Sequence, residues 1–192
     1  MPSSISGTAL ALPAIGSDIQ ASLTHLQWVV NAFNLAFACF TLAWGALADR
    51  LGRKRCFVAG AALYVLASVI SALASEAWVL DIGRALAGIG AAAIFSCGIA
   101  ILSTHFDGAA RLRAFALFGT VAGLGVSLGP TLSGLLIESV GWRAIFWAHT
   151  LTLALVLLGT PLITRDGQLA EHKARFDLGG TTLFVAALLA LM

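Results

Sequence analysis

Arg84 is the residue of this chain whose type and position most clearly suggest chemistry. It lies about seven residues into an apolar run that begins near Ala77, or about 10 Å deep if the run is a helix that crosses a membrane. An unpaired charge at such a depth costs at least about 2–3 kcal/mol, so the guanidinium must face a cavity or a partner. Asp81 stands three residues earlier on the same helical face and could pair with it locally. The competing interpretation is an arginine that reaches the outer interface and is tied to Asp81.

A second charged segment, residues 45–55, separates two uncharged apolar runs and reads GALADRLGRKR. Gly45 and Gly52 allow helix ends to approach each other and to turn tightly. Asp49 can sit at a helix amino terminus or pair with a nearby cation. Four basic residues can hold the segment at an anionic inner leaflet: Arg50, Arg53, Lys54 and Arg55. The segment therefore predicts a cytoplasmic loop between two membrane helices.

The composition indicates an integral membrane protein. Hydrophobic residues make up 59% of the 192 residues and charged residues 10%, against roughly 45–50% and about 25% in soluble domains. The three cysteines are expected as small apolar side chains in helices, and most of the four histidines in loops, with only His149 inside an apolar run. No metal-type spacing, nucleophile with a base or phosphate loop stands out. We expect no enzyme, no cofactor, no metal and no nucleic-acid partner.

Five apolar runs are long enough to cross a hydrocarbon layer of about 30 Å. They are Trp28 to Leu47, Cys56 to Ala74, Trp78 to Leu102, Ala114 to Ile137 and Ala144 to Ile163. A shorter run, Ile5 to Ile15, precedes them, and Leu178 to Met192 is still apolar where the sequence stops. A signal peptide is the competing interpretation of residues 1–20, although no basic residue precedes the apolar core.

These runs predict an all-α membrane protein with six transmembrane helices and the start of a seventh. We expect residues 1–163 to form a six-helix bundle with a truncated first helix, residues 164–177 a cytoplasmic link, and residues 178–192 the beginning of the seventh helix. In the connections, basic residues alternate. Nine lie on every second connection: Arg50, Arg53, Lys54, Arg55, Arg111, Arg113, Arg165, Lys173 and Arg175. Because only Arg143 lies on the opposite connections, the positive-inside rule predicts a cytoplasmic amino terminus in the plasma (inner) membrane.

An internal repeat relates the two halves of the bundle. The pattern G-x-x-x-[DE]-x-x-G-x-[KR] occurs twice at an offset of 89 residues, as Gly45, Asp49, Gly52 and Lys54 and as Gly134, Glu138, Gly141 and Arg143. One copy falls on the cytoplasmic side and the other on the exterior. This predicts a three-plus-three inverted repeat, the architecture with which transporters alternate access to a central site.

The segment Gly45–Arg55 fits the pattern G-x-x-x-D-[RK]-x-G-[RK]-[RK], and on this motif the chain resembles the amino-terminal half of a major facilitator superfamily transporter. In that superfamily the loop latches the two halves together in the outward-facing state. The resemblance assigns this latch to Gly45, Asp49, Arg50, Gly52, Arg53 and Lys54, where a plain membrane anchor is the alternative for the basic residues. Arg84-Ala-Leu-Ala-Gly88-Ile-Gly90 is similar to the fourth-helix motif R-x-x-x-G-x-G, which implies a role for Arg84 and Asp81 in proton coupling. Ala87 replaces the usual glutamine of that motif.

The fifth run holds two pairs of glycines four residues apart, Gly119/Gly123 and Gly125/Gly129, which favour close helix packing, and Pro130, which removes a backbone donor and kinks a helix. Its sequence is similar to the antiporter motif G-x-x-x-G-P-x-x-G-G at Gly125, Gly129, Pro130 and Gly134, with Ser133 in place of one glycine. With the short predicted link, this resemblance points to the fourteen-helix drug/proton antiporters. That branch commonly carries a first-helix aspartate where this chain has Ser4, which puts coupling through a first-helix carboxylate in doubt.

The resemblance implies proton-coupled efflux of hydrophobic or amphiphilic drugs and toxic compounds. The expected partners are a small-molecule substrate, protons, the lipid bilayer and a missing carboxy-terminal half, with Asn31 and Asn34 as polar cavity lining or as bonds between helices. Two alternatives remain open: a proton-coupled uptake symporter of the same fold, and a membrane sensor or scaffold that does not transport.

Overall fold

The computed structural model describes residues 2–162, which form six α-helices and a final 3-10 turn. The helices are α1 (Pro2–Asp18), α2 (Leu23–Leu51), α3 (Arg53–Ala72), α4 (Ala77–His105), α5 (Gly108–Ser139) and α6 (Arg143–Gly159), and the turn η1 covers Thr160–Leu162. The prediction of an all-helical chain is confirmed for these residues. The predicted link and seventh helix, residues 164–177 and 178–192, lie outside them.

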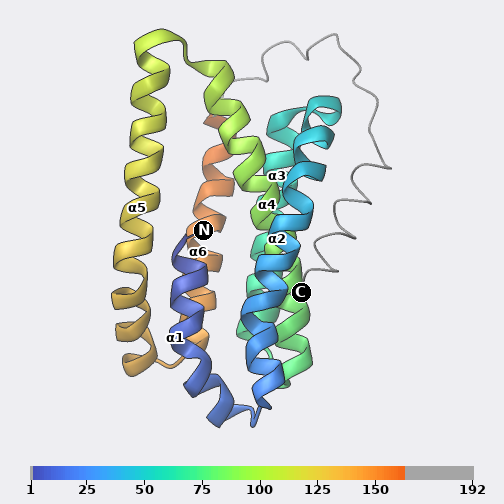
Figure 1. Cartoon of the computed structure of the whole chain (residues 1–192), viewed down its shortest axis with the longest axis vertical. Coiled ribbons are helices and arrows are strands. Elements are labelled where there is room, and N and C mark those ends of the chain that lie inside the picture. The colour runs from blue at the N-terminus through green and yellow to red at the C-terminus, as the bar shows by residue number, and fades with distance from the viewer. Residues whose placement is uncertain (1, 163–192) are drawn as a thin grey trace.

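Four helices, α2 to α5, are long and apolar enough to cross a membrane by their length and composition. α6 is a shorter apolar helix of 17 residues, and α1 also has 17. Figure 1 shows that α1 begins about halfway along the bundle. That all six helices span the membrane therefore remains a prediction.

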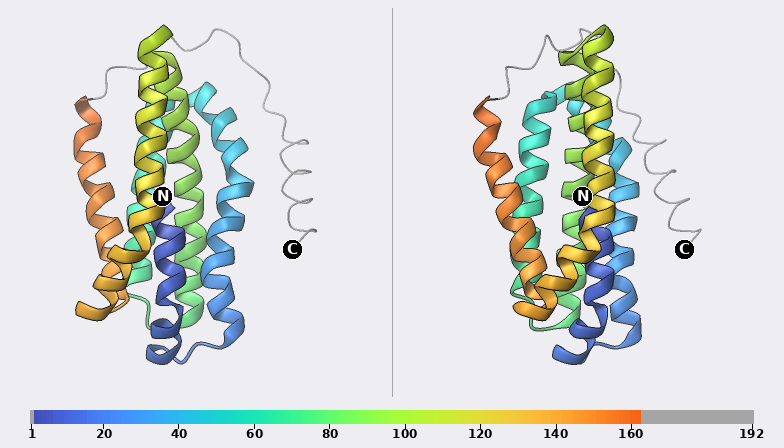
Figure 2. Two further views of the ribbon diagram at one scale, coloured as in Figure 1. Left: turned by 60° about the vertical axis from the view of Figure 1, so that its left-hand side comes forward. Right: turned by 90° about the vertical axis from the view of Figure 1, so that its left-hand side faces the viewer.

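α4 is the central helix of the bundle. It packs along α2 and α3, while α3 also packs along α6 and α1 lies against α5 (Figures 1 and 2). α1 is part of this packing, because Ser4, Thr8, Ala11 and Ile15 are fully buried. The segment with signal-peptide character thus forms a helix inside the bundle.

The connections alternate between the two ends of the bundle. The turn at Gly52 and residues 106–107 lie at one end, which we call the Gly52 end; residues 19–22, 73–76 and 140–142 lie at the other, the Gly141 end (Figure 1). The Gly52 end carries six basic residues of the described chain: Arg50, Arg53, Lys54, Arg55, Arg111 and Arg113. Arg143 is at the Gly141 end. The charge asymmetry read from the sequence is therefore an asymmetry between the two ends of the bundle.

The predicted loop at residues 45–55 is wrong, because α2 continues to Leu51 and α3 begins at Arg53. Only Gly52 is outside a helix, and its φ of +97° is one that L side chains rarely adopt. The Gly52 amide donates to the Ala48 carbonyl at 3.0 Å, which closes α2. Gly141, its partner in the predicted repeat, has a φ of +102° between α5 and α6. The two matched glycines therefore make turns in the same backbone region, and the inverted repeat itself remains a prediction.

Gly141→Ala is expected to lower the stability of the folded protein by about 1–2 kcal/mol, because a side chain is strained at this φ. Gly134→Ala is the matched control: a Cβ meets nothing within 4 Å at either glycine, but Gly134 lies inside α5, where alanine stabilises a helix by about 0.5–1 kcal/mol. Thermal unfolding in detergent should shift the two variants in opposite directions. A shared direction would contradict this account of the turn.

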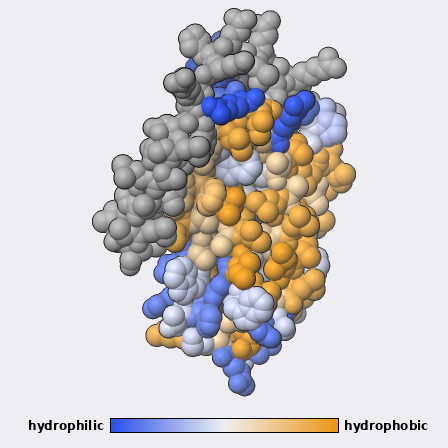
Figure 3. Space-filling model, turned by 90° about the vertical axis from the view of Figure 1, so that its right-hand side faces the viewer, coloured by the Kyte–Doolittle hydropathy of each residue, from blue (hydrophilic) through white to orange (hydrophobic). Residues whose placement is uncertain are grey.

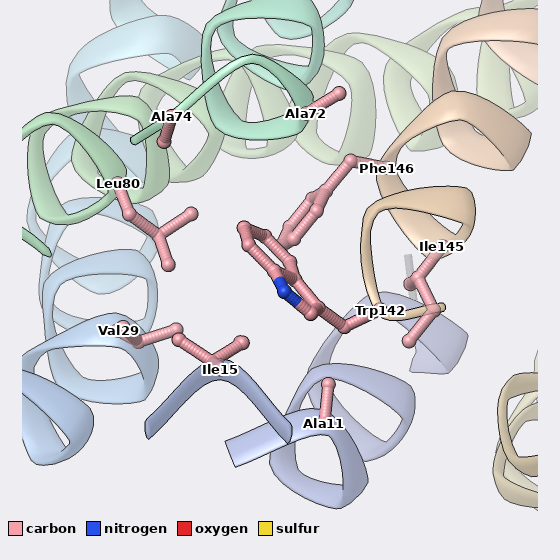
Figure 4. Close-up of a cluster of buried hydrophobic side chains, with 9 residues drawn as sticks. All are labelled: Ala11, Ile15, Val29, Ala72, Ala74, Leu80, Trp142, Ile145 and Phe146. Carbon is pink, nitrogen blue, oxygen red and sulfur yellow. The ribbon is translucent and has the colours of Figure 1, made fainter. Parts of the chain in front are cut away.

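The largest buried apolar cluster joins five helices at the Gly141 end (Figure 4). Trp142 and Phe146, at the start of α6, lie edge to face at 5.9 Å and fill the space between α1 and α4. The rest of the cluster is Ala11, Ile15, Val29, Ala72, Ala74, Leu80 and Ile145. On the face shown in Figure 3, the middle is largely apolar, and hydrophilic residues gather toward the two ends. An apolar middle of this kind is the surface that a bilayer-embedded helical bundle presents to lipid.

Candidate functional site

The Arg84 side chain lies in the interior of the bundle, only 2% exposed, and contacts three neighbouring helices. Its Nε donates to the Val29 carbonyl of α2 at 3.0 Å, and its Nη1 donates to the Ser4 hydroxyl of α1 at 3.3 Å. The guanidinium also lies over the Phe33 ring of α2, with Cζ 4.3 Å from the ring centroid. It is 5.9 Å from the Phe146 ring of α6. Arg84 therefore does not reach the outer interface, and the interpretation of a snorkelling arginine is wrong.

Tyr64 of α3 completes this group of side chains, which we call the Arg84 cluster: Ser4, Phe33, Tyr64, Arg84 and His149. The Tyr64 hydroxyl is buried and donates to the Ser4 hydroxyl at 2.8 Å. Its ring lies edge to face with Phe33, 6.5 Å between centroids, and 6.3 Å from the His149 ring of α6. Nδ1 of His149 is buried and has no hydrogen-bond partner among residues 2–162. The cluster thus brings side chains of five helices together, through hydrogen bonds at Ser4 and ring contacts at Phe33 and His149.

The Ser4 hydroxyl is the shared hydrogen-bond acceptor of the Arg84 cluster. Its Oγ accepts from both Arg84 and Tyr64, and the side chain is fully buried. This is the position at which the resemblance leads one to expect an aspartate. A carboxylate here would lie within reach of the guanidinium, whereas a hydroxyl leaves its charge surrounded by neutral groups. Among residues 2–162, Arg84 forms no ion pair with a carboxylate.

The local pair of Asp81 with Arg84 is not formed. Asp81 Oδ2 lies 2.6 Å from Nδ1 of His25, at the start of α2, and its Oδ1 is buried without a hydrogen-bond partner in the described chain. His25 is in the first turn of α2 rather than in a loop. Asp81 and Arg84 of α4 thus have separate partners, Asp81 at the Gly141 end and Arg84 deeper in the bundle.

Glycines of the R-x-x-x-G-x-G motif bring α4 close enough to its neighbours to enclose Arg84. A Cβ on Gly90 would stand 2.7 Å from the Gly60 carbonyl oxygen of α3, and one on Gly88 would stand 2.9 Å from the Ala36 Cβ of α2. Ala87, at the position of the usual glutamine, is also buried. The motif therefore describes a helix crossing as well as a charged site.

At the Gly52 end, the predicted latch residues meet α4. Arg53 donates to Asp49 at 3.3 Å across the turn and to the Ala100 carbonyl of α4 at 3.1 Å. Asp49 is half exposed, and a Cβ on Gly45 would meet no atom within 4 Å. The pairing of Asp49 with a nearby cation is confirmed. Arg50 and Lys54 lie beside it at the end of α2 and the start of α3, and the latch role of the six residues remains a prediction.

At the Gly141 end, Arg143 ties three parts of the bundle together. Its Nη1 donates to Asp18 of α1 at 2.5 Å, and its Nη2 donates to the Ala74 carbonyl between α3 and α4 at 3.0 Å. The Trp142 indole also donates to Asp18, at 3.1 Å. These hydrogen bonds, that from Arg143 first, lower the pKa of the Asp18 carboxyl, which is at the exposed end of α1.

The glycines of α5 do not all mark a helix contact. Gly129 and Ser133 are buried against Gly7 of α1. A Cβ added to Gly7 would collide with the Ser133 hydroxyl. A Cβ on Gly119, Gly123 or Gly134, in contrast, would meet no atom within 4 Å among the described residues. The predicted close packing of the Gly119/Gly123 pair is therefore wrong within residues 2–162.

The rest of the antiporter motif also has a defined place. α5 continues through Pro130 to Ser139, and Figure 2 shows its last turns leaning away from the direction of the rest of the helix. Gly125 lies one turn before Gly129 on α5. The glycines and the proline of the motif all lie within α5, so the proline bends the helix without ending it.

The predicted cavity-lining residues lie on α2, with Asn31 exposed and Asn34 partly buried. Neither side chain forms a hydrogen bond with the Arg84 cluster within residues 2–162. The three cysteines, Cys39, Cys56 and Cys97, are buried in helices, as predicted, and form no disulfide within residues 2–162. Sequence reasoning missed Tyr64, His149 and His25 as site residues. The only signal that pointed to His149 was its position inside an apolar run.

The sequence of the chain is similar to those of known proteins. The family model of the Major Facilitator Superfamily matches residues 1–191. The chain is 38% identical over 184 residues to Multidrug resistance protein Stp of Mycobacterium tuberculosis, a match that covers 95% of this chain and 34% of the relative. It is 36% identical to Puromycin resistance protein pur8 of Streptomyces alboniger, over 95% of this chain and 36% of the relative.

A third relative is Cephamycin export protein CmcT of Amycolatopsis lactamdurans, 33% identical over 93% of this chain and 37% of its own length. The chain thus spans about a third of the length of these relatives. Because the family model covers nearly all of its residues, the chain belongs to the Major Facilitator Superfamily.

Proposed function

We propose that this chain is the amino-terminal part of a proton-driven exporter that moves hydrophobic or amphiphilic compounds out of the cell. The observation that carries the proposal is the enclosed charge of Arg84, which stands in the centre of the bundle against neutral groups of α1, α2 and α3. A soluble or purely structural helical bundle has no need for such a charge, whose transfer from water is costly. The names of the relatives, which are resistance and export proteins, support the same direction of transport.

Arg84 acts in this proposal as a permanent positive charge. A guanidinium does not lose its proton under physiological conditions, so Arg84 cannot carry the transported proton itself. Its role is to set the electrostatic potential between α1, α3 and α6, where a proton or a charged substrate passing nearby feels it strongly because the surroundings are apolar.

In the complete transporter, we place the described bundle in the plasma membrane with the Gly52 end in the cytoplasm. This orientation rests on the six basic residues at that end. The largely exposed face of α5, with its open glycines and exposed Leu124, Leu128 and Leu135, is available to a second half of the transporter. Substrate would pass between the halves while the Gly52 turn and the Arg143 contacts alternately hold one end closed, as an inverted repeat allows.

The test is transport by the full-length protein in everted membrane vesicles. With an imposed pH gradient, acid inside, the vesicles should accumulate ethidium or puromycin, and collapsing the gradient with an ionophore should stop accumulation. Vesicles without the transporter are the control. Uptake of neither probe, or uptake that ignores the pH gradient, would count against a proton-driven exporter.

A further inference from the structure

The His25–Asp81 pair is a second polar contact inside the bundle, separate from the Arg84 cluster. Nδ1 of His25 and Oδ2 of Asp81 are 2.6 Å apart, and the residues are 56 positions apart in the chain. The pair joins the first turn of α2 to the beginning of α4 at the Gly141 end. The His25 side chain is 44% exposed and that of Asp81 is 17% exposed. The imidazole therefore lies between the surface and the more enclosed carboxylate.

Asp81 differs from every other carboxylate of residues 2–162. The others are exposed: Asp18, Asp49, Glu76, Asp107 and Glu138. One oxygen of Asp81, Oδ1, is also buried and lacks a hydrogen-bond partner among these residues. A charged oxygen without a partner is costly in an apolar interior, and a proton on the carboxyl group removes that cost. The carboxyl group of Asp81 is thus the one in the described chain best placed to gain and lose a proton.

Few other charges act on this pair. α1 presents Asp18 at this end, but Asp18 is held by Arg143 of α6. Glu76, just before α4, accepts from the Trp78 indole, and Arg84 is engaged with α1 and α2. The end of α3 that faces this region, residues 66–72, has no ionisable side chain. His25 is therefore the immediate ionic partner of Asp81 in the described chain.

We propose that the His25–Asp81 pair binds the proton whose movement drives export, a proposal that rests on the proton-driven function above. When the pair holds a single proton, between Nδ1 and Oδ2, and Nε2 is bare, its charge is −1. A second proton, taken up from the Gly141 side by Nε2 of the exposed imidazole, makes the pair neutral. The proton then leaves the pair when the opposite side of the transporter opens. Ser4 has no titratable group, so the pair supplies a protonatable carboxyl that the first helix does not place at the Arg84 cluster.

Proton binding is coupled to shape through the cost of burying charge. A neutral pair can be enclosed between α2 and α4 at much lower cost than an anionic one. Uptake of the proton therefore favours closure of the Gly141 end, and release favours its opening. Because His25 lies on α2 and Asp81 on α4, a change in the protonation of the pair acts directly on the contact between these two helices.

The experiment compares two activities of full-length variants in proteoliposomes, with ethidium and puromycin as probes. The first is accumulation driven by a pH gradient; the second is exchange of the probe across the membrane without any gradient, which needs substrate binding and conformational change but no net proton movement. Asp81→Asn should lower gradient-driven accumulation at least about tenfold and keep exchange within about twofold of the parent. His25→Gln should shift the pH dependence of gradient-driven transport. Asp81→Glu, which keeps a carboxyl group, should retain part of the gradient-driven accumulation that Asp81→Asn loses.

Asp107→Asn is the matched control, because it makes the same change at an exposed carboxylate outside the helices. It should leave both activities unchanged. If Asp81→Asn keeps gradient-driven accumulation, the proposal is overturned while proton-driven export by the parent protein still stands. If Asp81→Asn and His25→Gln both lose exchange together with accumulation, the pair is a structural tie and the proposal is also overturned. Failure of the parent protein to use the pH gradient would instead remove the proposed function.

Discussion

Arg84→Leu is expected to lower proton-driven export by the full-length transporter at least about a hundredfold while leaving the protein folded. The substitution removes the only charge in the Arg84 cluster and its hydrogen bonds to Val29 and Ser4. Transport should fail because the potential that this charge sets between α1 and α3 is gone. Gradient-driven accumulation of ethidium or puromycin in everted vesicles measures the effect.

The stability of the same variant should change little, which separates a functional role from a structural one. Replacing a buried ion pair by apolar side chains of similar size is often neutral or stabilising by about 1–4 kcal/mol, because the desolvation cost disappears, and the loss of Arg84 leaves no charged partner behind. Against this stands the lost contact with the Phe33 ring, worth about 0.5–2 kcal/mol. The Tyr64 hydroxyl can still donate to Ser4 in the variant. The thermal unfolding midpoint in detergent should therefore stay within several degrees of the parent.

Two further variants define what Arg84 contributes. Arg84→Lys keeps the charge but cannot direct separate N–H groups to Val29 and Ser4, so export should stay strongly reduced. Arg113→Leu makes the same arginine-to-leucine change at an exposed position of α5 and should leave export nearly unchanged. Normal export by Arg84→Leu would remove Arg84 from the mechanism.

The sequence predicted the helices better than their ends. An uncharged run identifies the part of a helix that suits lipid, but α2 continues through Asp49 and Arg50 because polar residues are tolerated beyond the hydrocarbon layer. The predicted loop was therefore two helix ends joined at Gly52. Here the positive φ of a single glycine, a property of the backbone, decides where the chain turns.

The burial of Arg84 could be predicted from depth and charge, but its partners could not. Ser4 is 80 positions away, and no local pattern links the two residues. Asp81, three positions away, was the nearest candidate, yet it bonds to His25 of α2 instead. Spacing along one helix shows which residues share a face, whereas the choice of partner depends on how three or four helices cross.

The sequence also does not show which glycines lie at contacts between helices. α4 carries Gly88 and Gly90 and α5 carries Gly119 and Gly123, but only the first two lie at close contacts with other helices in residues 2–162. A small residue permits close approach without specifying a neighbour. The difference depends on α4 being enclosed by α2 and α3, while α5 packs mainly against the short α1.

Gly90→Ala is accordingly expected to be among the most destabilising small substitutions in this chain, although alanine is the better helix former. The added Cβ would lie 2.7 Å from the Gly60 carbonyl oxygen and 2.8 Å from the Tyr64 amide nitrogen. Both are backbone atoms of α3, so no side-chain rotation can relieve the contact and the two helices must separate. Such overpacking typically costs about 1–3 kcal/mol, which exceeds the gain of about 1 kcal/mol in helix propensity.

Gly98→Ala is the matched control on the same helix, because its added Cβ meets only the Phe57 ring, at 3.8 Å, an ordinary contact. The thermal unfolding midpoint should therefore fall for Gly90→Ala and stay equal or rise for Gly98→Ala. Export should fall with the first variant as well, since moving α3 carries Tyr64 away from Ser4 and opens the space around Arg84. Equal midpoints for the two variants would show that α3 and α4 are not in tight contact at Gly60 and Gly90, and the enclosure of Arg84 would then need another cause.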